Sequence, residues 1–176
     1  MRRRRRLVVW GGVGVLVAAL AVGLVLGTAG SSAQAPLLAP LPRLGGGAPV
    51  ALTGAHGPHR PTAITFFASW CTPCRRELPE IAGVARAEAA QGGRVVFLGV
   101  DGNDDPASGL AFARASGVTF PVAVDATSSV APRFGLYGYP DTVFVDAGGD
   151  VAGVVRGPIS AATLRQWLGR LSSGSA

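Results

Sequence analysis

The sequence predicts an α/β domain built on a mixed β-sheet. Along its middle, short apolar runs of strand length alternate with longer segments of helical periodicity, which is the pattern of parallel strands joined by helices. Near its end, two strand-like runs flank Ala147-Gly148-Gly149-Asp150, a turn that would join them as an antiparallel hairpin. Parallel and antiparallel pairs in one sheet make it a mixed sheet sandwiched with helices.

Five segments are expected to form the strands of this sheet. Each is short and rich in β-branched, aromatic or other apolar residues, and turn residues bound each one. The expected strands span residues 63–68, 95–100, 120–124, 142–146 and 151–156. A further small hairpin is expected around Gly45-Gly46-Gly47, because Leu41, Leu44, Val50 and Leu52 flank that turn.

Three segments are expected to form helices. Residues 72–90 place Leu78, Ile81, Ala82 and Ala85 on one face at helical spacing. Residues 106–115 form the second helix. The last runs to Leu171, with Ser160 as its N-cap. A short helical turn is expected over residues 128–134.

The N-terminus has the pattern of a membrane segment. Five arginines, residues 2–6, precede 21 apolar residues from Leu7 to Gly27, which as a helix would span roughly 30 Å, the thickness of a bilayer core. Basic residues stay in the cytoplasm, so the remainder is expected outside it. The alternative is a signal peptide cleaved after Ala35, at the A-x-A pattern of residues 33–35.

These features divide the chain into segments. We expect a basic cytoplasmic N-terminus (1–6), a transmembrane anchor or signal segment (7–29), a linker (30–37), the α/β domain (38–172) and a tail (173–176). The net charge of +6 gives no basic binding face, because the five N-terminal arginines supply +5 of it. A nucleic-acid partner is therefore not expected.

The chemistry of the sequence is concentrated in Trp70-Cys71-Thr72-Pro73-Cys74, where the first strand gives way to a helix. Cysteines at i and i+3 on a first helical turn can close a disulfide, and the helix N-terminus stabilises a thiolate. Cys71 would be the exposed nucleophile, and the more buried Cys74 would resolve the mixed disulfide. The alternatives without redox activity are a structural disulfide and a zinc site completed by His56 and His59. No cofactor beyond a redox-active Cys71–Cys74 disulfide, and no metal, is expected.

With Pro79 after the motif and Tyr139-Pro140-Asp141-Thr142 at the start of a late strand, the sequence resembles the thioredoxin fold. More narrowly, it resembles the membrane-anchored TlpA/ResA-type thiol–disulfide oxidoreductases. The anchor, the segment Arg75-Arg76-Glu77-Leu78-Pro79 and an extra helix and strand between Pro106 and Val124 point to that branch. The resemblance covers about residues 38–172.

The resemblance implies roles for individual residues. Pro140 would be a cis-proline facing the cysteines and would expose the backbone of Tyr139 to an extended substrate. Trp70, Thr72 and Pro73 would complete the docking surface. Glu77 would accept the proton of Cys74 during resolution, the alternative being a solvated acid near a helix start.

Two departures from the family pattern are visible. Thr65 stands where thioredoxins carry a buried aspartate, so that strand offers no base. Tyr139 replaces a smaller aliphatic residue and Asp141 follows the proline, so the docking groove is expected to be bulkier and more acidic.

The resemblance implies an extracytoplasmic reductant of protein disulfides, such as those of apocytochrome c, recharged by a membrane thiol donor. A general disulfide oxidase or isomerase, a redox-dead binding module and a peroxiredoxin are the alternatives. The last would need a Thr at position 68, within P-x-x-x-T-x-x-C, and Ala68 stands there. Uncharged Thr72 and Pro73 favour a reducing potential of roughly −220 to −280 mV, with Arg75 as a further stabiliser of the Cys71 thiolate.

Overall fold

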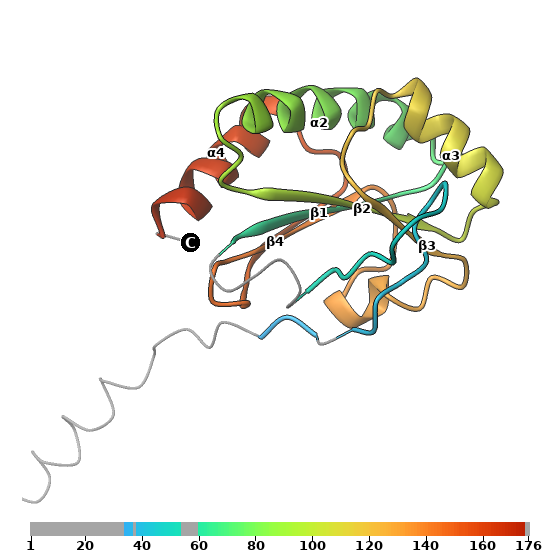
Figure 1. The fold of residues 1–176 in the computed structure, drawn as a ribbon, viewed down its shortest axis with the longest axis horizontal. Coiled ribbons are helices and arrows are strands. Elements are labelled where there is room, and N and C mark those ends of the chain that lie inside the picture. Colours follow the sequence, from blue (N-terminus) through green and yellow to red (C-terminus); the bar gives the residue numbers. More distant parts are fainter. Residues whose placement is uncertain (1–33, 37, 54–59, 175–176) are drawn as a thin grey trace, which may run out of the picture. The chain divides into compact units, whose positions relative to one another are not determined.

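The structure is a computed structural model that describes residues 34–36, 38–53 and 60–174. Within these residues, five strands form one sheet in the order β3-β2-β1-β4-β5 (Figure 1). The parallel part pairs β1 with β2 and β2 with β3, whereas β4 runs antiparallel to both β1 and β5. The predicted mixed sheet is therefore confirmed. The strands are β1 (Thr62–Phe67), β2 (Val96–Gly102), β3 (Val122–Asp125), β4 (Asp141–Val145) and β5 (Val151–Arg156).

The predicted helices are also confirmed. They are α2 (Thr72–Ala90), α3 (Pro106–Ala115) and α4 (Ala161–Ser173), and the expected short turn is the 3₁₀ helix η1 (Ala131–Phe134). The predicted N-cap is present, since the Ser160 hydroxyl accepts the backbone N–H of Thr163 at 3.1 Å. Asp105 caps α3 in the same way by accepting the N–H of Ser108 at 2.9 Å.

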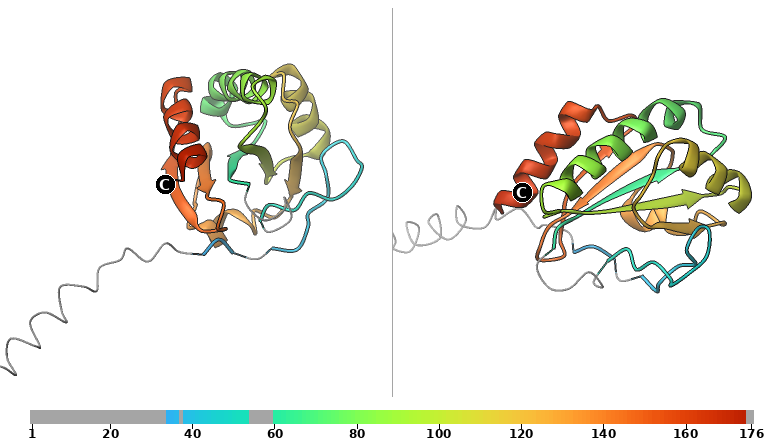
Figure 2. Two further views of the ribbon diagram at one scale, coloured as in Figure 1. Left: turned by 60° about the vertical axis from the view of Figure 1, so that its left-hand side comes forward. Right: turned by 45° about the horizontal axis from the view of Figure 1, so that its top comes forward.

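All three α-helices cover one face of the sheet (Figures 1 and 2). The sequence predicted flanking helices but not this one-sided arrangement. For α2 and α3 it follows from right-handed crossovers, because β1, β2 and β3 are laid down in one direction across the sheet. The last helix, α4, packs beside α2 on that face. The other face is covered by η1 and by the segment before β1.

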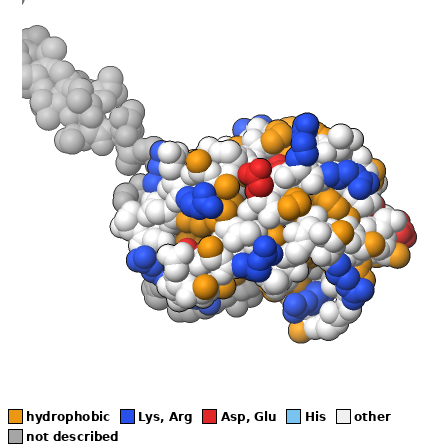
Figure 3. Space-filling model, turned by 90° about the horizontal axis from the view of Figure 1, so that it is seen from above, with side chains coloured by type: hydrophobic (Ala, Val, Ile, Leu, Met, Phe, Trp, Pro, Cys, Tyr) orange, Lys and Arg blue, Asp and Glu red, His pale blue; other side chains and the backbone are white. Residues whose placement is uncertain are grey.

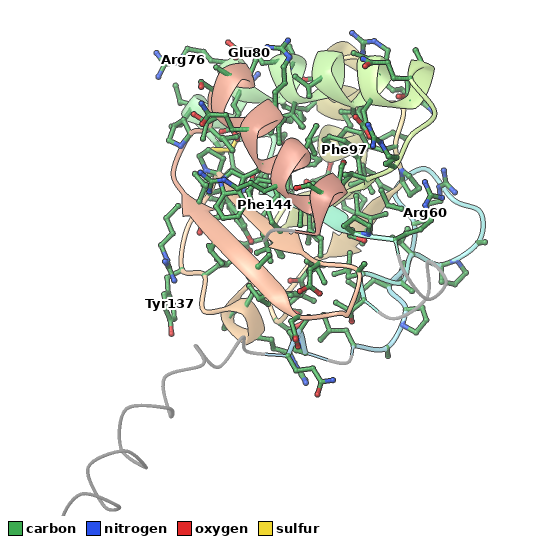
Figure 4. All side chains as sticks on the ribbon, turned by 90° about the vertical axis from the view of Figure 1, so that its left-hand side faces the viewer. Arg60, Arg76, Glu80, Phe97, Tyr137 and Phe144 are labelled. Carbon is green, nitrogen blue, oxygen red and sulfur yellow. A yellow bond between two sulfur atoms is a disulfide. The ribbon has the colours of Figure 1, made fainter. Side chains whose placement is uncertain are left out.

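The hydrophobic core therefore has two parts, one on each face of the sheet. On the helical face, Phe97 and Phe144 lie under the helices (Figure 4), and Phe144 stacks on Trp167 of α4 at 4.7 Å between ring centroids. On the other face, Phe66 meets Phe134 of η1 edge to face at 5.8 Å. Alternation along each strand supplies both faces with apolar side chains.

The expected hairpin around Gly45-Gly46-Gly47 consists of a single pair of bridged residues. Leu41 and Val50 exchange two backbone hydrogen bonds of 2.9 and 2.8 Å, and no longer ladder forms. The segment pairs instead with the sheet edge through Arg43 and Ala123. Ala35, in the segment expected to be a linker, is 5% exposed and donates its N–H to the Gly149 carbonyl.

The expected membrane segment at residues 7–29 lies outside the described residues. Among the helices that the structure does describe, none combines the length and the apolar character needed to cross a bilayer. Arginines on the helical face are scattered among uncharged side chains rather than gathered (Figure 3).

Candidate active site

The predicted pair, Cys71 and Cys74, forms a disulfide at the start of α2. Strand β1 ends at Phe67, and a short turn brings Cys71 to the N-cap position of the helix. There its Sγ accepts the backbone N–H of Cys74 at 3.2 Å. The same N–H groups that need an acceptor at a helix start are thus available to a Cys71 thiolate.

Both sulfur atoms lie in a largely apolar cluster. Cys71 is 4% exposed and Cys74 is 1% exposed, so the expectation of an exposed Cys71 is wrong for the disulfide form. The reason is that Phe67 and Ala68, at the end of β1, pack around the bridge. The order of burial agrees with the prediction, because Cys74 is the deeper of the two.

Trp70 and the predicted cis-proline meet at this site. The Tyr139–Pro140 bond is cis, and the Trp70 and Tyr139 rings lie 5.8 Å apart. Trp70 is 55% exposed, so it lies on the surface, where the docking role expected of it requires it to be. Thr72 is also exposed, and Pro73 is half-buried. Residues some 70 positions apart in the chain thereby form one surface beside the disulfide.

The two side chains expected to alter the groove are partly turned away from it. The Tyr139 phenol lies over Gly102 and hydrogen-bonds Ser128 Oγ at 2.7 Å. Asp141 is 5% exposed and accepts the Gly157 N–H at 2.8 Å, so the expected acidic groove is wrong. The exposed aromatic in this loop is Tyr137, which projects into solvent (Figure 4).

Glu77 is buried one turn beyond Cys74. It is 4% exposed, and neither carboxylate oxygen has a hydrogen-bond partner of good geometry among the described residues. Burial raises the pKa of Glu77 to about 7; a backbone contact at Ile159 opposes this and the charge of Asp141 adds to it. The alternative of a solvated acid is therefore wrong.

Sequence reasoning missed a second buried acid. Asp101, at the end of β2, is 1% exposed, and burial, followed by the charge of Asp104, raises its pKa to about 7. The available signal was an acid ending an apolar strand beside the strand that carries the motif. Arg75 also differs from expectation, because it donates to the Ser69 carbonyl at 2.7 Å and lies over the Phe112 ring.

The described residues contain no group of three or more His, Cys, Asp or Glu side chains placed to hold a metal ion. The two histidines of the zinc alternative lie outside those residues. What the site does hold is a dithiol–disulfide pair at a helix N-terminus, next to a cis-proline and two buried acids.

Fold and site together define a thioredoxin-like domain with a C-x-x-C disulfide. The AhpC/TSA family model matches residues 33–154, and the chain belongs to that family. It is 29% identical over 105 residues to the thiol-disulfide oxidoreductase ResA of Geobacillus thermodenitrificans, covering 60% of this chain and 59% of the relative. It is 30% identical over 119 residues to the thiol:disulfide interchange protein CycY of Rhizobium leguminosarum, covering 67% and 61%.

Among solved structures, dsbF of Mycobacterium tuberculosis superposes with a TM-score of 0.67 at 30% identity, covering 79% of this chain and 98% of that one. The predicted thioredoxin-like fold and the resemblance to ResA-type proteins are thus confirmed. The chain spans about three fifths of the length of the curated relatives it matches.

Proposed function

We propose that this protein is an extracytoplasmic thiol–disulfide oxidoreductase that reduces disulfides of other proteins. The observation that carries the proposal is the Cys71–Cys74 pair at the α2 N-terminus, packed beside the cis Tyr139–Pro140 bond. The names of the ResA and CycY relatives support it. From the family resemblance, we propose that the specific substrate is the disulfide of apocytochrome c.

The proposed reaction uses both cysteines in turn. The Cys71 thiolate attacks one sulfur of a substrate disulfide, forming a mixed disulfide and releasing the other substrate sulfur as a thiolate. Cys74 then attacks the Cys71 sulfur, which closes the Cys71–Cys74 disulfide and frees the second substrate thiolate. Two electrons pass from the protein to the substrate, and a membrane thiol donor must return them before the next cycle.

Glu77 is proposed as the base for the second step. It lies one turn from Cys74 on the same helix and has a pKa raised to about 7 by burial, so near neutral pH it can accept the proton that Cys74 must lose. Position 65 offers no carboxylate. Thr65 is 3% exposed on β1, and the acid at position 77 takes over the role that a strand aspartate would fill.

The substrate is proposed to dock across Trp70, Thr72, Pro73 and the backbone of Tyr139. Trp70 and Thr72 are exposed, whereas Pro140 is buried. An extended segment can add hydrogen bonds to the free backbone beside the cis-proline while its disulfide meets Cys71. The half-buried Tyr139 ring, held by Ser128, would limit how closely side chains approach from that side.

The proposed location is the bacterial cytoplasmic membrane, with the N-terminus inside and the catalytic domain outside, or secretion if cleavage follows Ala35. The basis is the arginine block before the apolar segment. A periplasmic and a cytoplasmic reporter, each fused after Ala176, test this topology. Activity of the cytoplasmic reporter alone would refute it.

The function is tested by insulin reduction with a dithiol donor, alongside hydrogen peroxide consumption by the same preparation. We expect disulfide reduction that requires both cysteines, and no peroxide turnover above that of free dithiol. Peroxide turnover that depends on Cys71 would favour a peroxiredoxin instead. Retained insulin reduction in Cys71→Ser would refute the proposed site.

A further inference from the structure

The loop that carries Trp70 and Cys71 is held by the loop between β2 and α3. Because β1 and β2 are parallel, their carboxyl ends lie at the same edge of the sheet, and the loops that follow them are neighbours (Figure 1). Trp70 Nε1 donates to the Asn103 carbonyl at 2.9 Å. Two residues before Cys71, Ser69 is held at both ends of its backbone, by Asp104 and by Arg75.

Asp104 is the centre of this connection. Its carboxylate accepts the Ser69 N–H, the Ser69 hydroxyl at 2.8 Å and the N–H of Asp105 at 2.9 Å. Three hydrogen-bond donors from two loops therefore converge on this one carboxylate. The Asp104 carboxylate also lies close enough to the carboxyl group of Asp101 for the two to interact through their charges and through a side-chain hydrogen bond.

Asp101 is enclosed by the fold. Its side chain is 1% exposed, and in chain register it sits opposite Phe67 on β1, whose ring packs in the cluster with the cysteines. The carboxyl lies directly against the α3 backbone at Gly109, where any Cβ would overlap it. Neither oxygen has an N–H or hydroxyl donor among the described residues.

Two carboxylates cannot hydrogen-bond each other, because neither has a donor. A single proton on Asp101 changes this, since the protonated acid can donate to the Asp104 carboxylate. That one bond gives one of the two buried Asp101 oxygens a partner, avoids an unpaired buried charge and adds a donor to those around Asp104. The buried position therefore suits a neutral Asp101.

We propose that Asp101 and Asp104 share one proton and act as a positioning pair, which holds the Ser69–Cys71 loop and makes its geometry and charge depend on pH. The proposal rests on the proposed function, and it adds a second control of Cys71 reactivity besides the helix terminus. When the pair loses its proton, a second negative charge appears behind Cys71, and repulsion between the carboxylates loosens the contact of Asp104 with Ser69.

Among the described residues, none of those that face Asp101 from the neighbouring strands and from α3 carries a positive charge. The facing residues are Phe67 on β1, Val124 on β3 and Gly109 on α3. The charged or titratable neighbours are Asp105 at the α3 N-cap, the Tyr139 phenol, and Arg75, which reaches the other side of Ser69. Burial first, and then the charges of the neighbouring acids, raise the pKa of Asp101 to about 7. Arg75 is linked to the pair through the Ser69 carbonyl.

Asp101→Asn separates the hydrogen bond between the two side chains from the ionisation of Asp101. The amide keeps a donor for Asp104 and the shape of the side chain but cannot ionise. Glu77→Gln is the matched control, since it removes the other buried acid with a pKa near 7 and leaves the pair intact. In the oxidised protein neither cysteine titrates, so thiol ionisation does not obscure the result.

The test is an NMR titration of the oxidised full chain in detergent micelles between pH 5 and 9. We expect the Asp101 carboxyl carbon and the Ser69 amide to show one shared inflection near neutral pH. That Ser69 inflection should vanish in Asp101→Asn and persist in Glu77→Gln. Alkylation of the reduced protein should show an apparent Cys71 pKa about half a unit lower in Asp101→Asn than in the wild type, as expected for removing one partly screened charge.

The wild-type carboxyl titration needs no variant, so it decides the question even if Asp101→Asn does not fold. An Asp101 carbon that titrates in the ordinary aspartate range would overturn the proposal. So would a Ser69 inflection that survives Asp101→Asn or disappears with Glu77→Gln. If Ser69 and Asp101 titrate together but insulin is not reduced, the proposed function fails and the proton-sharing pair stands. If insulin is reduced but Ser69 and Asp101 show no shared inflection, the proton-sharing pair is refuted and the proposed function stands.

Discussion

Glu77→Gln should remove a pH-dependent loss of stability. In the unfolded chain Glu77 ionises near its ordinary pKa of 4.5, whereas in the fold its pKa is about 7. The folded protein therefore keeps a proton that the unfolded chain releases, and stability falls as the pH rises from 4.5 to about 7. A pKa difference of that size corresponds to about 3 kcal/mol, and the 4% exposure of Glu77 leaves little solvent screening to reduce it.

The assay is denaturant unfolding of the full chain, with its disulfide intact, at pH 4 and pH 8. The quantity compared is the free energy of unfolding at pH 8 minus that at pH 4. It should be about 3 kcal/mol more positive in Glu77→Gln than in the wild type. Taking this double difference cancels the titration of other acids and the fixed cost of burying an amide.

Glu80→Gln is the matched control for this measurement. Glu80 lies three residues further along α2 and is exposed (Figure 4). Its charge is only a minor cause of the raised Glu77 pKa, so Glu80→Gln should change the pH dependence of stability far less than Glu77→Gln does. If Glu77→Gln behaves like Glu80→Gln, the burial of an ionisable Glu77 in the native fold is refuted.

Three further predictions concern the site. Cys71→Ser should abolish insulin reduction, whereas Cys74→Ser should trap a mixed disulfide through Cys71, detectable by mass spectrometry; trapping through position 74 would reverse the roles. Gly102→Ala should lower stability by about 1–3 kcal/mol in thermal unfolding, because its Cβ would overlap the Tyr139 phenol. Gly138→Ala, which meets no atom within 4 Å, is its control, and equal melting of the two variants would contradict the placement of Tyr139. Equilibration with glutathione should give a potential of roughly −220 to −280 mV, and a value above about −160 mV would indicate an oxidant instead.

Local patterns were sufficient for the secondary structure and the reactive pair. The bounds of α2 and α3 agree with the periodicity and with the proline near each helix start, because these signals act within one or two turns. The C-x-x-C spacing likewise depends only on the geometry of a first helical turn. The hairpin near Gly45 was overestimated, since a turn signal does not say whether flanking residues pair with each other or with another strand.

Charge environments could not be predicted in this way. Asp141 was assigned to an open groove from its place after Pro140, but β5 and Gly157 enclose it. Asp101 received no role because its strand and the motif strand are separated by a whole helix in the sequence. A pKa depends on burial and on neighbours from other elements, and these exist only after the sheet has formed.

The sequence by itself determined the alternation of strands and helices and the disulfide-forming pair at a helix start. Each of these follows from side-chain periodicity, backbone geometry or spacing within a few residues. Only the tertiary structure decided that all three helices cover one face, that Cys71 is buried, and that Glu77 and Asp101 lose their solvent. The physical reason is that burial and electrostatic coupling arise between segments far apart in the chain, so no local pattern encodes them.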